Sequence, residues 1–382
     1  MRVLERNTLM DIINSLKNSV LLVLLFLLPL HINLESMKIF IYPVLLICFG
    51  VVYFISYIMS GAILQLLGNA SVLLAGIFLA PAIIMIFYTK DLYIFLTLTA
   101  MLSLGSAIID YSRSGHGVNE TRSYLYSGSI IGLVFLAEHY IALRIIYVFY
   151  IMAVLIIAFS LAFYLSGHME INYRKTTLIK KLKRYIISLS DIKRIRNGWT
   201  LLYAIMINVV LFISIAIVLL TVPVLALSNG GITTIYIFLG IASLSFLAIS
   251  LGSAINSRVF SGISFVAVFP FLLVMGFLIS IKNTEFNLTT GFLMFPAVAL
   301  FFPGYRKYFT RKFPGSEIYY ANKFANFFSW VFILPMPFIL LEFLHIPVYT
   351  VIIELIASMA GLIMVLKFTN YPEIIWTKKH KN

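Results

Sequence analysis

The chain has 382 residues, of which 62% are hydrophobic and only 11% are charged. This composition, with a mean hydropathy of +1.03, excludes a water-soluble monomer and indicates a protein whose solvent is the lipid bilayer. The net charge of +14 does not indicate a nucleic-acid partner, because the basic residues lie in loops between apolar segments, where anionic lipid headgroups account for them.

Apolar runs long enough to cross a bilayer follow one another along the whole chain. A membrane helix needs about 20 mostly apolar residues. The runs also lack the alternation expected of barrel strands, so we predict an all-α polytopic membrane protein with twelve spans. The expected spans are residues 13–31, 38–59, 70–88, 92–110, 124–141, 144–166, 199–226, 232–252, 262–281, 288–303, 323–343 and 347–367.

A polar, strongly basic stretch at residues 169–198 divides the chain into two halves of similar length. Its Lys and Arg residues are opposed only by Glu170 and Asp191, whereas the flanking sequence is apolar for many tens of residues. We therefore predict three parts: an N-terminal six-helix bundle at 1–168, a basic cytoplasmic linker at 169–198 and a C-terminal six-helix bundle at 199–382.

The distribution of positive charge predicts the orientation of these spans. All but four of the 28 Lys and Arg residues fall on one side of the expected membrane, and that side includes both termini and the linker. By the positive-inside rule this side is cytoplasmic. Both termini inside requires an even number of crossings, which agrees with twelve, and we expect a multi-pass protein of the cell membrane.

Six spans, a basic linker and six more spans resemble the major facilitator superfamily of secondary transporters. After its second span that family usually has a cytoplasmic loop of the form G-x-L-A-D-R-x-G-R-K, and residues 61–70 here read GAILQLLGNA. Gly61 and Gly68 fall at the family spacing. Gln65 stands at the acidic position, and the basic positions are not basic, so the charge relay of that loop is absent.

The corresponding loop after the eighth span repeats part of this pattern. Gly252 matches the first glycine, Asn256 stands at the acidic position, and Arg258 retains one basic residue. Glycines permit a tight turn and a close approach of helix ends, which a sliding gate between bundles can use. Ordinary small-residue helix packing is the alternative for each of them.

The resemblance implies alternating access to a midplane site, lined by spans one, four, seven and ten. Hydroxyl and amide side chains in the fourth and seventh spans are therefore candidates for the cavity wall. The alternative is that each hydroxyl bonds a carbonyl of its own helix. The candidates are Thr97, Thr99, Ser103, Ser106, Asn208 and Ser214.

Ionisable residues inside lipid are costly and thus informative. Glu354 lies about two turns into the last span, and we predict it as the proton-coupling carboxylate. The alternative is a carboxylate near the outer end of the helix that reaches water or pairs with another span. At the inner end of the fourth span, Asp110, Arg113 and Arg122 can form a cytoplasmic gate, although we favour solvated anchors.

Enzyme motifs are absent from the sequence. It contains no His-Glu-x-x-His helix, no Gly-x-Ser-x-Gly elbow and no Walker loop, its histidines are scattered, and Cys48 is the single cysteine. We therefore expect no catalytic site, metal or cofactor, and membrane lipids and a small-molecule substrate as partners.

The main prediction is a secondary transporter of a small solute. A lipid-linked flippase or exporter of another twelve-span fold and a non-transporting membrane scaffold subunit are the alternatives. Substrate, direction, coupling ion and oligomeric state stay open.

Overall fold

The chain divides into two compact units, Met1–Leu189 and Ser190–Asn382, and each is described by itself. The structure is a computed structural model, and it describes residues 2–34, 41–114, 120–141, 145–166, 195, 197–211, 213, 231–254, 265–270 and 347–369, with separate positions between 272 and 329. Within these ranges the regular structure is helical and contains no strand. Most of the expected linker lies outside the described residues.

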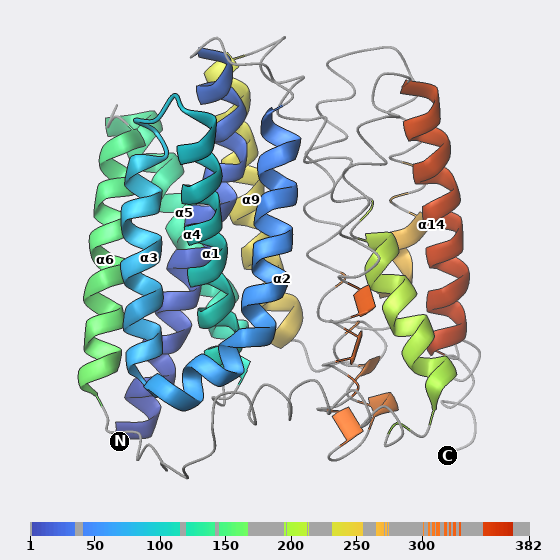
Figure 1. Cartoon of the computed structure of the whole chain (residues 1–382). Coiled ribbons are helices and arrows are strands. Elements are labelled where there is room, and N and C mark those ends of the chain that lie inside the picture. Colours follow the sequence, from blue (N-terminus) through green and yellow to red (C-terminus); the bar gives the residue numbers. More distant parts are fainter. Residues whose placement is uncertain are drawn as a thin grey trace. The chain divides into compact units, whose positions relative to one another are not determined.

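Successive long helices that alternate in direction form the first unit (Figure 1). The expected second to sixth spans overlap α2 to α6, because turn residues interrupt the apolar sequence between them. The first helix is longer than expected and begins at Arg2 rather than at residue 13. The bounds are α1 Arg2–Leu34, α2 Ile41–Leu67, α3 Ala70–Met85, α4 Leu92–Ser114, α5 Glu120–Ile141 and α6 Ile145–Leu165.

The connection between α2 and α3 is much tighter than the expected loop at residues 61–70. Gly61 and Gln65 lie within α2, which continues to Leu67, so the turn is confined to Gly68 and Asn69. Gly68 has a φ of 56°, a left-handed conformation that glycine adopts without a steric cost. Its N–H donates to the carbonyl of Leu64 at 2.8 Å, which closes the end of α2.

Helix α3 lies between α4 and α6 and approaches both closely. A Cβ on Gly105 of α4 would lie 2.6 Å from Cγ of Leu79 and 2.9 Å from the carbonyl oxygen of Ala75. Gly76 of α3 faces Ser160 of α6 in the same way. Small residues thus let these backbones pack at short distance, which is the usual basis of helix association in lipid.

The second unit contains α9 (Gly231–Ala254), α14 (Pro347–Thr369) and an apolar helical segment, Gly198–Leu211. The eighth and twelfth expected spans, 232–252 and 347–367, lie within α9 and α14. Aromatic side chains form much of the described core: the ring of Phe265 lies 5.2 Å from that of Phe301 and 5.9 Å from that of Tyr308. Gly361 of α14 packs directly against the ring of Phe269.

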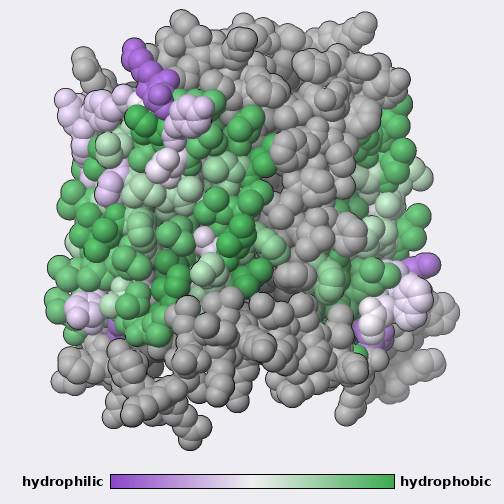
Figure 2. Space-filling view, in the orientation of Figure 1, coloured by the Kyte–Doolittle hydropathy of each residue, from purple (hydrophilic) through white to green (hydrophobic). Residues whose placement is uncertain are grey.

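Three helices in the described part of the chain are long and apolar enough to cross a membrane: Val44–Leu64, Leu92–Arg113 and Ile146–Leu165. Large apolar side chains such as Ile151, Val154 and Leu165 of α6 are exposed on the outside of the first unit. In Figure 2, apolar residues cover the middle of the first unit, and hydrophilic residues gather toward its upper end in this view. Such a surface is compatible with lipid contact and indicates association with a membrane.

Candidate functional site

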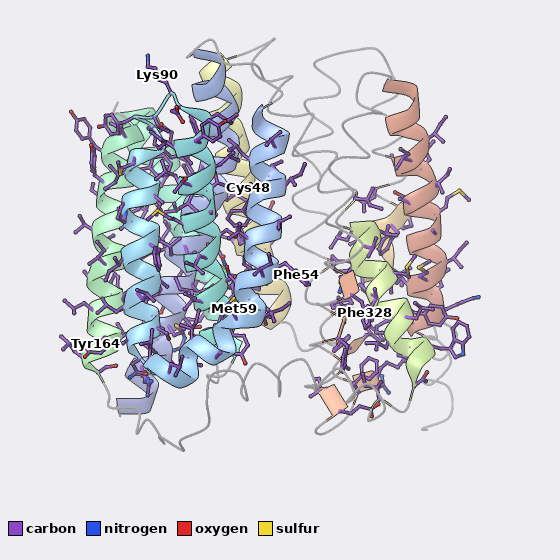
Figure 3. The ribbon with its side chains drawn as sticks, viewed as in Figure 1. Cys48, Phe54, Met59, Lys90, Tyr164 and Phe328 are labelled. Carbon is purple, nitrogen blue, oxygen red and sulfur yellow. The ribbon has the colours of Figure 1, made fainter. Side chains whose placement is uncertain are left out.

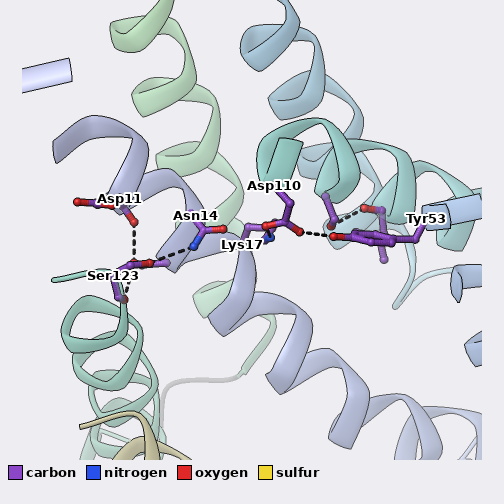
Figure 4. Close-up of polar contacts among 9 residues, drawn as sticks. Asp11, Asn14, Lys17, Tyr53, Asp110 and Ser123 are labelled. Carbon is purple, nitrogen blue, oxygen red and sulfur yellow. Dashed lines mark hydrogen bonds and ion pairs between the residues drawn. The ribbon is translucent and has the colours of Figure 1, made fainter. Parts of the chain in front are cut away.

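A buried ion pair between α1 and α4 is the centre of the polar structure in the first unit (Figure 4). Nζ of Lys17 lies 2.5 Å from Oδ1 of Asp110, and the hydroxyl of Tyr53 donates to Oδ2 of the same carboxylate at 2.8 Å. Lys17 is on α1, Tyr53 on α2 and Asp110 on α4. One carboxylate therefore links three helices, and we call these three residues the Lys17 cluster.

Burial is unequal across the ion pair. The side chain of Lys17 is only 2% exposed, whereas that of Asp110 is 25% exposed. The lysine is thus enclosed by the protein, and the carboxylate lies where its helix nears its end at Ser114. Breaking a buried ion pair by removing one partner typically costs about 3–5 kcal/mol, because the remaining charge is left without compensation.

An aromatic ladder along α2 positions the hydroxyl of Tyr53. Phe49, Tyr53 and Tyr57 follow one another at four-residue spacing, so their rings stack on one face of the helix with centroids 6.0 Å apart. Tyr57 then meets Tyr111 of α4 edge to face at 5.5 Å. The ladder restricts the rotation of Tyr53 and holds α2 against the part of α4 that contains Asp110.

Serines hold α1 against α5 beside the Lys17 cluster. Oγ of Ser15 lies 2.8 Å from the carbonyl oxygen of Ser123, and Nδ2 of Asn14 donates to Oγ of Ser123 at 3.0 Å. Ser19 and Ser127 repeat this contact one turn further along, with 3.3 Å between Oγ of Ser19 and the carbonyl of Ser127. Small polar side chains at four-residue spacing let α1 and α5 approach closely, and their polar groups form hydrogen bonds with one another.

Two arginines anchor the beginning of α1. The guanidinium of Arg6 donates to Oδ1 of Asn69 in the α2–α3 turn, and its Cζ lies 5.0 Å from the ring centre of Phe163 near the end of α6. Arg122 of α5 donates to Oγ1 of Thr8 at 3.2 Å. Partial burial lowers the pKa of Arg6, yet a guanidinium stays charged at any physiological pH.

The gate residues predicted at the inner end of the fourth span have distinct environments. Asp110 lies inside α4 and binds Lys17 and Tyr53. Arg122 binds Thr8. Arg113 is half-buried, and its charge lies close enough to Lys17 to repel it. The described contacts of Asp110 are thus within the first unit.

The four hydroxyls predicted to line a cavity in the fourth span are used in different ways. Thr97 and Ser106 donate to carbonyls of their own helix, at Tyr93 and Leu102, over 2.8 and 2.7 Å. Ser103 donates to the carbonyl of Phe49 in α2 at 2.6 Å.

Thr99 is 5% exposed, and its hydroxyl has no hydrogen-bond partner in the part of the chain that the structure describes.

In the second unit, Nδ2 of Asn208 donates to the hydroxyl of Tyr305 at 3.0 Å, at the edge of the aromatic core. Gly252 lies in α9 and Glu354 lies in α14, and the side chain of Glu354 is outside the described residues. Ser214, Asn256 and Arg258 also lie outside them.

Sequence reasoning did not single out Lys17 or Tyr53. The available signal was Lys17 itself, an ionisable residue four positions inside the expected span 13–31. Its partner Asp110 lies 93 positions away, so no local pattern joins the two. Tyr53 reads as one aromatic residue among 22 tyrosines in the chain.

Comparison with known proteins adds no relative: the chain matches no protein-family model, and no curated protein matches its sequence. The geometry of the Lys17 cluster therefore has to support a function by itself.

Proposed function

We propose that this chain is a secondary transporter that moves a small solute across the cell membrane by alternating access. The observation that supports this proposal is the Lys17 cluster, a charged pair buried in an apolar helical unit. Ionisable groups at membrane depth are costly to keep, and they usually mark the pathway of a substrate or an ion. A carboxylate shared by three helices can also transmit a binding event to all of them.

A purely structural role explains the cluster less well. The same unit joins α1 to α5 with serines and an asparagine, which need no buried charge. A neutral contact of that kind would also hold α1 to α4, and replacing a buried ion pair by apolar residues is often neutral or stabilising. Retaining the costly pair therefore favours a role in which the charges themselves act.

The proposed architecture has two six-helix bundles of the major facilitator type, with twelve spans and cytoplasmic termini. Two features support it. The helices α1 to α6 precede residue 166 and alternate in direction, as a six-span bundle requires (Figure 1). The basic stretch 169–198 then follows, where the positive-inside rule favours the cytoplasm.

Reconstitution of the purified full-length protein into liposomes tests the proposal. Uptake of radiolabelled sugars, radiolabelled amino acids and an amphiphilic fluorescent dye is compared with protein-free liposomes. We expect saturable uptake of at least one of these solutes. The double variant Lys17→Met with Asp110→Asn, which removes both charges, should lose that uptake while remaining monodisperse in size-exclusion chromatography.

The matched control is Lys367→Met, which removes a lysine from the exposed surface of α14 and should leave uptake unchanged. Uptake that equals protein-free liposomes for the whole panel would contradict the proposal. Scrambling of a fluorescent phospholipid without solute uptake would identify a flippase instead, and neither activity would indicate a scaffold subunit.

A further inference from the structure

We infer that the carboxylate of Asp110 is a proton-binding site, and that its protonation releases Lys17 and loosens α4 from α1 and α2. This inference rests on the proposed transport function, because it names the proton as the coupling ion and Asp110, rather than Glu354, as the group that binds it.

Access to the cluster is one-sided. Asp110 is 25% exposed and Lys17 only 2%, so the carboxylate is the group of the pair that is accessible from outside the helices. Asp110 also lies four residues before the end of α4, close to the end of the helix. The pair therefore has an accessible carboxylate at the helix end and a buried ammonium behind it.

A proton on Asp110 changes both of its interhelical contacts. The new O–H bond forms at a lone pair of Oδ1 or Oδ2, and no other bond breaks. The neutral acid can still exchange a hydrogen bond with Tyr53, but it no longer provides a counter-charge for Lys17. The ammonium is then a buried cation without compensation, which is strongly unfavourable until the helices move and water enters.

The charged groups around the pair reinforce this response. Arg113, one turn beyond Asp110 on α4, repels Lys17. Asp11 lies about 120° around α1 from Lys17, from the helical repeat, and Figure 4 shows it toward Ser123 rather than Asp110. Helix α3 has no titratable residue. On α5, Tyr124 lies close enough to Asp110 and Arg113 to interact with their charges, and Arg122 binds Thr8. On α1, Arg6 binds Asn69.

Infrared spectroscopy tests proton binding without requiring transport. The full-length protein in lipid nanodiscs is titrated from neutral to acidic pH, and the carbonyl band of a buried, protonated carboxylic acid is followed. We expect this band in the wild type and its loss in Asp110→Asn. The matched control is Asp91→Asn, at the other end of α4, where an exposed carboxylate caps the helix and asparagine caps equally well. This control should retain the band.

The single cysteine reports whether the helices separate. Sγ of Cys48 on α2 lies 3.7 Å from the carbonyl oxygen of Leu96 on α4, and the side chain is half-buried (Figure 3). At one fixed pH, so that thiol ionisation in bulk water is the same, Asp110→Asn should be alkylated by N-ethylmaleimide several-fold faster than the wild type. Asp91→Asn should react at the wild-type rate.

The outcomes separate this inference from the proposed function. If liposomes transport a solute but Asp110→Asn keeps the acid band or the wild-type alkylation rate, the inference is overturned and the transporter stands. If both tests succeed but no solute moves, the proton site stands and the transporter proposal fails. A variant that elutes as an aggregate is replaced by Asp110→Glu, which should restore the acid band and slow alkylation again; absence of both would overturn the inference.

Discussion

A Cβ atom on Gly76 of α3 would lie 2.8 Å from Oγ and 3.0 Å from Cβ of Ser160 on α6. These are shorter than ordinary van der Waals contacts, so position 76 has room only for a hydrogen atom. The same pair also sets the distance between the two helix backbones. A change on either helix is therefore felt by the other.

We predict that Gly76→Ala lowers the apparent melting temperature of the detergent-solubilised protein, since overpacking costs about 1–3 kcal/mol. The double variant Gly76→Ala with Ser160→Gly should be more stable than Gly76→Ala alone, because it moves the small residue to the facing helix. Gly198→Ala is the control, since nothing lies within 4 Å of that position. Equal losses in the single and double variants would exclude a steric contact.

Removing one charge of the Lys17 cluster should be more damaging than removing both. We expect Asp110→Asn to cost about 3 kcal/mol, because it leaves the buried ammonium of Lys17 unpaired, and Lys17→Met to cost less, because the remaining carboxylate is 25% exposed. The double variant should recover most of that loss. Thermal unfolding, followed by the fraction that stays monodisperse after heating, measures this, and additive losses in the double variant would show that the two groups are independent.

The serine contact between α1 and α5 makes a graded prediction. Ser123→Ala removes the acceptor of Asn14 and should cost about 1 kcal/mol, whereas Ser123→Leu also forces α1 and α5 apart and should cost more. Ser106→Ala serves as control, because Ser106 bonds only its own helix among the described contacts. The apparent melting temperature should fall in the order Ser106→Ala, Ser123→Ala, Ser123→Leu.

Asn208 allows a test between a structural contact and a cavity wall. If its bond to Tyr305 is structural, Asn208→Ala and Tyr305→Phe should each lower stability by about 1 kcal/mol. The double variant should then lose less than the sum of the two. Unchanged melting temperatures combined with an altered apparent affinity for solute in liposomes would instead assign Asn208 to the cavity.

The helical class and many of the helix positions were predictable from the sequence. Apolar run lengths and turn residues placed α3 from Ala70, α4 from Leu92 and α14 from Pro347, as the structure has them. Prediction from hydropathy misses the parts of a helix that are made of polar residues. Helix α1 extends back to Arg2, because its polar residues find partners on other helices, which a hydropathy profile does not represent.

The candidate site was predicted less completely, for a physical reason. Asp110 was recognised from its place at the end of the fourth span, but its partners Lys17 and Tyr53 are brought to it by the packing of three helices. The hydroxyls of Thr97 and Ser106 followed the alternative that sequence analysis kept open, namely bonds to their own helix. The sequence alone does not distinguish a hydroxyl that bonds its own helix from one that lines a cavity.

Arg6 has a consequence for the order in which the first unit assembles. Its guanidinium contacts Asn69 and the ring of Phe163, so the first turns of the chain cannot reach their final place until the sixth helix has been made. A ribosome that stops before residue 163 leaves this cation without its aromatic cover. The start of α1 is thus the first part of this unit to be synthesised and one of the last to be fixed, because it is held in place only when α6 is complete.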